Sequence, residues 1–234
     1  MASAALVYPG DANWANPGIA NGGGGSSAIT NAAPRSGNGS LELHGDRTRF
    51  FGLGDPENPS SNLMLLSEVN NFTYDWMIDP SSVSALHVDY TPALRLHIWD
   101  GNQKSELIWE GAYNNTYGNT TKGDWQTSSA DDFFWRWETG IGFTLLPGGA
   151  QANLAISDWA NSSNLWYSAN AYVAGISVGV GSSAGGSYYA FADNVILNDQ
   201  TFNFEVRNTV PEPAMSALFG LSLIGFGIAR KRRK

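Results

Sequence analysis

The clearest strand signal in the chain reads Phe-Thr-Tyr-Asp-Trp-Met-Ile, residues 72–78. Its large apolar side chains fall at every second position, and a β-strand points alternate side chains to opposite faces. The same period recurs in Leu-Arg-Leu-His-Ile-Trp, residues 94–99. Further runs of this kind lie at residues 41–44, 107–113, 133–137, 172–180 and 188–197. The chain is therefore predicted to consist mainly of strands.

Turn-forming residues separate these runs, as in Gly-Asp-Pro-Glu-Asn-Pro at residues 54–59 and Pro-Gly-Gly at 147–149. Residues 14–34 are rich in Gly, Ala, Asn and Ser, and we expect a loop there with one short edge strand at 28–30. Residues 151–161 carry the one convincing helical pattern within the body. Many short strands with turns between them predict an all-β fold, an antiparallel β-sandwich.

The charge distribution excludes several classes of function. The chain has 234 residues, a net charge of −8 and no cysteine. Five of its 13 basic residues are the last five, so residues 1–229 hold 8 basic against 21 acidic residues, a net of −13. Such an acidic body repels phosphate backbones, so we expect no nucleic-acid partner. The lack of cysteine excludes disulfides and cysteine nucleophiles.

The C-terminal segment differs from the body. Pro211, Glu212 and Pro213 end the strand pattern, because proline lacks the amide donor that a sheet needs. Residues 214–229 are then uncharged and mostly apolar, long enough as a helix for ~24 Å of a ~30 Å hydrocarbon core. The final residues are basic: Arg230, Lys231, Arg232, Arg233 and Lys234. We expect a C-terminal hydrophobic helix in the bacterial membrane with its basic end cytoplasmic, and the body outside.

This order of elements resembles the PEP-CTERM sorting signal of exopolysaccharide-producing bacteria. The resemblance covers residues 210–234 and rests on Val-Pro-Glu-Pro, the apolar run and the basic cluster. It implies an exosortase-type membrane protease as partner, which cleaves near Pro-Glu-Pro. The location that it implies is the cell envelope, cell surface or extracellular matrix of a Gram-negative-type bacterium. A core helix with a charged end and a plain tail anchor are the alternatives.

The body resembles jelly-roll carbohydrate-binding modules and lectin-like sandwiches. Residues 36–43, Ser-Gly-Asn-Gly-Ser-Leu-Glu-Leu, are similar to their first strand, and residues 189–197 to their last. The resemblance implies a structural calcium ion at Asp193 as the one candidate cofactor. Calcium takes six to eight oxygen ligands, and the sequence shows few of them, so an aspartate that caps a strand end is the alternative.

These segments suggest three parts. Residues 1–4 contain Ala-Ser-Ala, which fits a signal-peptide remnant or an ordinary terminus with small side chains. Residues 5–208 form the predicted β-sandwich domain, and residues 209–234 form the sorting segment.

Motifs for catalysis are weak in the body. Two Gly-x-Ser-x-Gly strings, at 175–179 and 181–185, lack the following helix that a nucleophile elbow requires. The three histidines lack zinc spacing, and solvated strand positions are expected for them. Glu106, Glu110 and the pair at 131–132 are interpreted as loop and edge charges. We therefore expect a protein that is not an enzyme.

The nine tryptophans are the remaining chemical signal, because flat rings stack on sugars. Arg95, His97 and Trp99 should project from the strand face opposite the apolar side chains, and they are the candidate carbohydrate-binding residues. Trp135 and Trp137 share a face but are expected to fill the core.

The sequence thus predicts an exported, non-catalytic surface or matrix protein that binds exopolysaccharide. One alternative is a polysaccharide hydrolase or lyase on the same fold, which would bring two carboxylates and a basic group into one groove. The other is a structural surface protein without a ligand.

Overall fold

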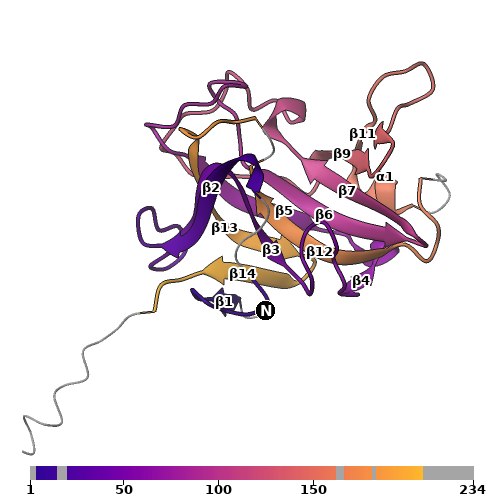
Figure 1. Cartoon of the computed structure of the whole chain (residues 1–234), viewed down its shortest axis with the longest axis horizontal. Coiled ribbons are helices and arrows are strands. Elements are labelled where there is room, and N and C mark those ends of the chain that lie inside the picture. The colour runs from indigo at the N-terminus through magenta and orange to yellow at the C-terminus, as the bar shows by residue number, and fades with distance from the viewer. Residues whose placement is uncertain (1–3, 15–19, 162–165, 181–182, 208–234) are drawn as a thin grey trace, which may run out of the picture.

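A computed structural model describes residues 4–14, 20–161, 166–180 and 183–207 (Figure 1). Three short helices lie in this part: η1 (Leu66–Glu68), η2 (Gly111–Tyr113) and α1 (Ile156–Ala160). The strands are β1 (Ala5–Val7), β2 (Ala20–Thr30), β3 (Ser40–Phe51), β4 (Met64–Leu65), β5 (Phe72–Ile78), β6 (Ala93–Asp100), β7 (Gln103–Trp109), β8 (Gln126–Thr127), β9 (Phe133–Glu138), β10 (Gly142–Phe143), β11 (Asn153–Ala155), β12 (Tyr172–Gly179), β13 (Tyr189–Leu197) and β14 (Gln200–Phe204).

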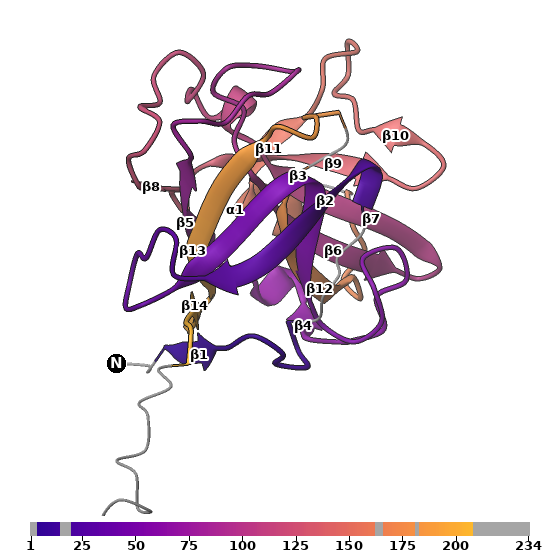
Figure 2. The same cartoon turned by 60° about the vertical axis from the view of Figure 1, so that its left-hand side comes forward.

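The strands form one continuous network in the order β1-β14-β13-β3-β12-β6-β7-β9-β10. Strand β3 joins its two halves, because residues 41–44 pair with β13 and residues 48–51 pair with β12. Figure 2 shows β13, β3 and β2 side by side. All these pairs are antiparallel except β1 with β14, which is parallel. The predicted all-β class is confirmed, while the likeness to a jelly roll stays a prediction.

The core lies where β5 faces β7 and β9. The ring centroid of Trp109 on β7 lies 5.3 Å from Tyr74 and 6.0 Å from Trp76, both on β5. Phe72 lies 6.0 Å from Phe134 of β9 in the same way. All five side chains are buried. The period-two pattern therefore predicted correctly which face of β5 packs inward, and these rings pack the two halves of the strand network against each other.

The glycine-rich segment before residue 31 differs from the expected loop. Strand β2 begins at Ala20 and pairs along β3, with a register shift between Ala20 and Gly25. Gly25 has a φ of +155°, and a Cβ there would lie 2.2 Å from the carbonyl oxygen of His44. Small residues are thus needed at this register shift, because the backbones of β2 and β3 approach each other closely there. From composition alone, such a glycine-rich segment is predicted to be a loop.

Residues 151–161 form a strand and a short helix instead of one long helix. Strand β11 pairs with β9, and α1 then covers only five residues. Trp159 of α1 is fully buried and donates a hydrogen bond of 2.9 Å from Nε1 to the carbonyl oxygen of Phe134. This hydrogen bond holds α1 against β9. The apolar residues of 151–161 therefore belong partly to the short helix α1 and partly to β11, and not to one long helix.

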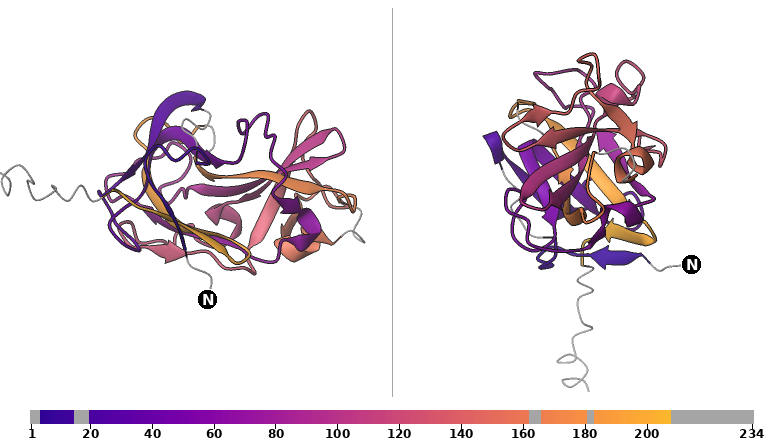
Figure 3. Two further views of the ribbon diagram at one scale, coloured as in Figure 1. Left: turned by 90° about the horizontal axis from the view of Figure 1, so that it is seen from below. Right: turned by 90° about the vertical axis from the view of Figure 1, so that its right-hand side faces the viewer.

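Strand β14 and the short β1 lie together at one edge of the molecule (Figure 3). The described chain ends at Arg207, shortly after β14, so the predicted C-terminal helix and residues 1–3 lie outside the described residues. Among the residues that are described, no helix has the length and apolar character needed to cross a membrane. The proposed division at residues 208 and 209 stays a prediction.

Candidate functional site

A groove of about 550 Å³ crosses the outer face of β6, β7 and β9. Aromatic rings and charged side chains line it together, which is the combination found in sites for polar ligands. Its lining residues are Leu86, Tyr90, Arg95, Glu106, Ile108, Glu110, Tyr113, Trp135, Trp137 and Phe143.

Strand register places these side chains in rows. Ile108 of β7 lies opposite Arg95 of β6 on one side and opposite Trp135 of β9 on the other. Two residues earlier on the same face, Glu106 lies opposite His97. Because side chains alternate between faces, these residues all point away from the core that the intervening leucines fill. The groove is therefore a consequence of three strands in register.

The rings form one wall of the groove. Trp135 is nearly buried, whereas Trp137 is 40% exposed and Phe143 of β10 is 48% exposed. Phe143 lies 5.1 Å from Trp135 and 5.4 Å from Trp137 between ring centroids. Tyr113 of η2 extends the cluster, with its ring 6.4 Å from that of Trp135. Exposed rings in a hollow surface can stack on the apolar face of a ligand.

A charged cluster forms the floor. Glu106 Oε2 lies 3.8 Å from Arg95 Nε, and Glu106 Oε1 lies 3.5 Å from His97 Nδ1. His97 Nε2 is 2.9 Å from the hydroxyl of Ser177 on β12, and Arg95 Nη1 is buried without a hydrogen-bond partner. Burial alone would raise the pKa of Glu106, but the neighbouring His97 and Arg95 lower it to about 2. Glu106 is therefore held as a carboxylate.

Glu110 follows the last residue of β7 in an extended conformation and lies in a different environment. Trp135 Nε1 donates a hydrogen bond of 3.2 Å to Glu110 Oε2. Burial raises the pKa of Glu110 above its ordinary value, although the charge of Arg95 and the indole N–H act in the opposite direction. The groove thus holds two carboxyl groups that bind protons with different strength.

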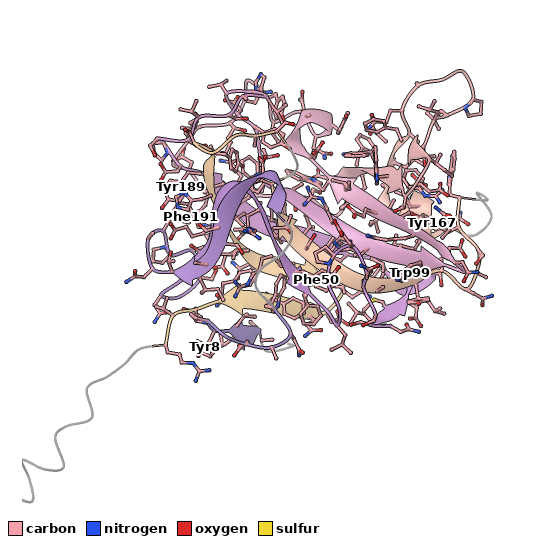
Figure 4. All side chains as sticks on the ribbon, viewed as in Figure 1. Tyr8, Phe50, Trp99, Tyr167, Tyr189 and Phe191 are labelled. Atoms are coloured by element: carbon pink, nitrogen blue, oxygen red, sulfur yellow. The ribbon has the colours of Figure 1, made fainter. Side chains whose placement is uncertain are left out.

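The structure separates the three predicted carbohydrate-binding residues. Arg95, His97 and Trp99 do lie on the face opposite Leu94, Leu96 and Ile98, as the period predicts. Arg95 and His97 are buried, so the interpretation of His97 as a solvated residue is wrong. Trp99, which is labelled in Figure 4, is outside the groove lining. Its Nε1 donates a hydrogen bond of 2.8 Å to the carbonyl oxygen of Pro59. A role of the three residues in carbohydrate binding stays a prediction.

Sequence reasoning did not select the two glutamates or the two tryptophans of the groove. Glu106 is not a loop or edge charge, because it lines the groove from β7, which has β6 and β9 as neighbours. Glu110 lies just after the end of β7, so the prediction of a loop charge is confirmed for it, although it lines the same groove. Trp137 is not core, since it is 40% exposed. The available signal was Glu-x-Ile-x-Glu at 106–110 together with Trp-x-Trp at 135–137, but only strand register brings the two together.

Asp193, the predicted calcium ligand, is fully buried on β13. Its Oδ1 accepts the backbone N–H of Phe204 at 2.9 Å, and its Oδ2 accepts that of Ser36 at 3.1 Å. Within the described ranges, no group of three or more His, Asp or Glu side chains could hold a metal ion. Both oxygens of the Asp193 carboxylate thus accept backbone N–H groups and tie the segment before β3 to β14, and a calcium ion at Asp193 stays a prediction.

The predicted sorting residues Pro211, Glu212, Pro213 and Arg230 to Lys234 lie outside the described residues. Residues 209–233 match the PEP-CTERM protein-sorting motif. This match confirms the sorting segment that the sequence predicts. It supports an exported protein that an exosortase sorts to the cell envelope or surface. No curated protein and no solved structure matches the chain.

The low pKa of Glu106 predicts a pH-dependent stability. The carboxylate stabilises the fold above its ordinary pKa of about 4.5, and this contribution is lost as the pH falls toward about 2. Glu106→Gln should therefore lower the free energy of unfolding at pH 7 by on the order of 3 kcal/mol. The difference in this free energy between wild type and the variant should become smaller between pH 4.5 and 2.5. Urea unfolding at several pH values measures this. A difference in unfolding free energy between wild type and Glu106→Gln that does not change with pH would contradict the assignment.

Proposed function

We propose that this exported protein binds a polysaccharide in the groove over β6, β7 and β9. The observation that carries the proposal is the shared hollow of Trp137, Phe143, Glu106 and Glu110. Ring faces stack on the apolar faces of sugars, and carboxylates accept hydrogen bonds from sugar hydroxyls.

The charges favour a neutral glycan. Glu106 is a carboxylate, and the basic side chains of Arg95 and His97 are already turned toward it. The body as a whole is acidic, with a net charge of −13 over residues 1–229 by the counts above. A polyanionic chain would be repelled at long range, whereas a hydroxyl-rich neutral chain would not.

Trp137→Ala tests the binding site. Trp137 is 40% exposed, so its removal should affect ligand stacking more than folding. Aromatic pairs contribute roughly 0.5–1.5 kcal/mol beyond area burial, which predicts a loss of affinity of roughly 2- to 13-fold. Affinity electrophoresis of the full chain in gels that contain neutral polysaccharides measures the change.

Trp125→Ala is the matched control, because Trp125 is also partly exposed but precedes β8, away from the groove lining. It should leave retention unchanged. Equal retention of wild type and Trp137→Ala would place the binding surface elsewhere. Retention by no polysaccharide, neutral or acidic, would favour a structural surface protein without a ligand.

A further inference from the structure

We propose that the groove hydrolyses the glycan that it binds, with Glu110 as the proton donor and Glu106 as the carboxylate base. The inference rests on the proposed function, because the substrate is the bound polysaccharide. It departs from the expectation of a non-catalytic domain, and it uses the arrangement that distinguishes an enzyme on this fold: two carboxyl groups and a basic group in one groove.

The first argument is position. Glu106 and Glu110 stand on the same face of one extended stretch, with Ile108 between them, and their Cα atoms are about 13 Å apart at 3.3 Å per residue. Both side chains turn toward the row of Ile108. Glu106 contacts Arg95, and Glu110 contacts Trp135, the two residues opposite Ile108. A sugar ring above Ile108 would thus have a carboxyl group on either side.

The second argument is the difference between the two environments. Glu106 faces the buried side chains of Arg95 and His97, which favour its ionised form. Glu110 is half-buried among rings and receives one indole N–H, and its pKa is raised. Hydrolysis of a glycosidic bond requires one carboxyl group that retains its proton and one that has lost it. The groove places the two carboxyl groups in environments that differ in this direction, through neighbours on β6 and β9.

The third argument is support of the base. His97 lies between Glu106 and the hydroxyl of Ser177, and Phe50 packs edge-on against it with ring centroids 5.4 Å apart. The imidazole is therefore fixed in orientation by groups on β12 and β3. Its role is to position the carboxylate of Glu106 in the floor of the groove, which is a positioning role and not contact with substrate.

The reaction balances without any other reactant. Glu106 accepts a proton from water while the water oxygen bonds to the anomeric carbon. Glu110 donates its proton to the glycosidic oxygen, and the bond between that oxygen and the anomeric carbon breaks. One water is consumed, and each new chain end carries a hydroxyl group. The next substrate turnover needs the proton to pass from Glu106 to solvent and from solvent to Glu110.

The experiment has two stages and uses the full-length protein. Affinity electrophoresis first identifies which of a panel of neutral polysaccharides (a β-glucan, a xylan, a mannan and starch) the wild type retains. Each retained polysaccharide is then incubated with the protein, and new reducing ends are counted. Wild type should release them, while Glu110→Gln and Glu106→Gln should be at least about 100-fold slower, a much larger loss than the fall in retention that the same variants show. Glu68→Gln, at an exposed position, should match wild type.

Each outcome decides the matter. Retention by wild type without new reducing ends would overturn hydrolysis and leave the binding proposal intact. Full activity in Glu110→Gln, with circular dichroism unchanged, would remove Glu110 as the proton donor. If no polysaccharide is retained at all, the proposed function fails and hydrolysis fails with it.

Discussion

Protein recovered from the surface of a host that has an exosortase should lack residues 214–234. The match to the PEP-CTERM protein-sorting motif covers residues 209–233, and the described body ends before it, at Arg207. Cleavage near Pro213 would therefore remove the apolar run and the basic cluster without touching β14. Intact-mass measurement of the surface protein should show this loss in all of the recovered material.

Two control experiments test this prediction. The same gene in a host without an exosortase should yield protein that keeps Arg230 to Lys234. A triple substitution of Pro211, Glu212 and Pro213 by alanine should also keep them, even where the exosortase is present. Mature surface protein that still carries the basic cluster would contradict processing and leave a tail anchor as the explanation of the segment.

The sequence predicts the fold class because side-chain alternation is a local property. In β5, every second residue from Phe72 to Ile78 is apolar and is buried in the core, and this pattern can be seen within seven residues. The sorting segment is equally local, since proline pair, apolar run and basic cluster follow each other along the chain. Such features need no knowledge of which strands pair.

The groove depends on long-range pairing, and the sequence does not reveal it. Ile108 and Trp135 are 27 positions apart, yet they are direct neighbours across β7 and β9. The alternation along β6 shows that Arg95 and His97 do not point into the core. It does not show that Glu106 and Ser177, on the two strands beside β6, contact them on the outer face and help to bury them. Burial on the outer face of a sheet is set by neighbouring strands and covering loops, which no single stretch encodes.

The largest loss of stability should follow substitution of Trp109, which lies on β7 behind the groove. Its side chain is 1% exposed and packs against Tyr74 and Trp76 of β5. Its Nε1 also donates a hydrogen bond of 2.7 Å to Asp132 Oδ2. Trp109→Ala would leave a cavity between β5 and β7 and remove that donor, which predicts a loss of about 3–5 kcal/mol in the free energy of unfolding.

Urea unfolding of the full-length variants measures this loss, with Trp125→Ala as the control for removal of a partly exposed indole. Trp109→Phe separates the two contributions, because phenylalanine keeps most of the ring contact but cannot donate a hydrogen bond to Asp132. Its loss of unfolding free energy should therefore be clearly smaller than that of Trp109→Ala.

Because Glu106 and Glu110 project from the opposite face of the same stretch, loosening of β7 should also reduce glycan retention. A Trp109→Ala protein within about 1 kcal/mol of wild type, the typical cost of an ordinary substitution, would show that the contact between β5 and β7 does not hold the two halves of the strand network together.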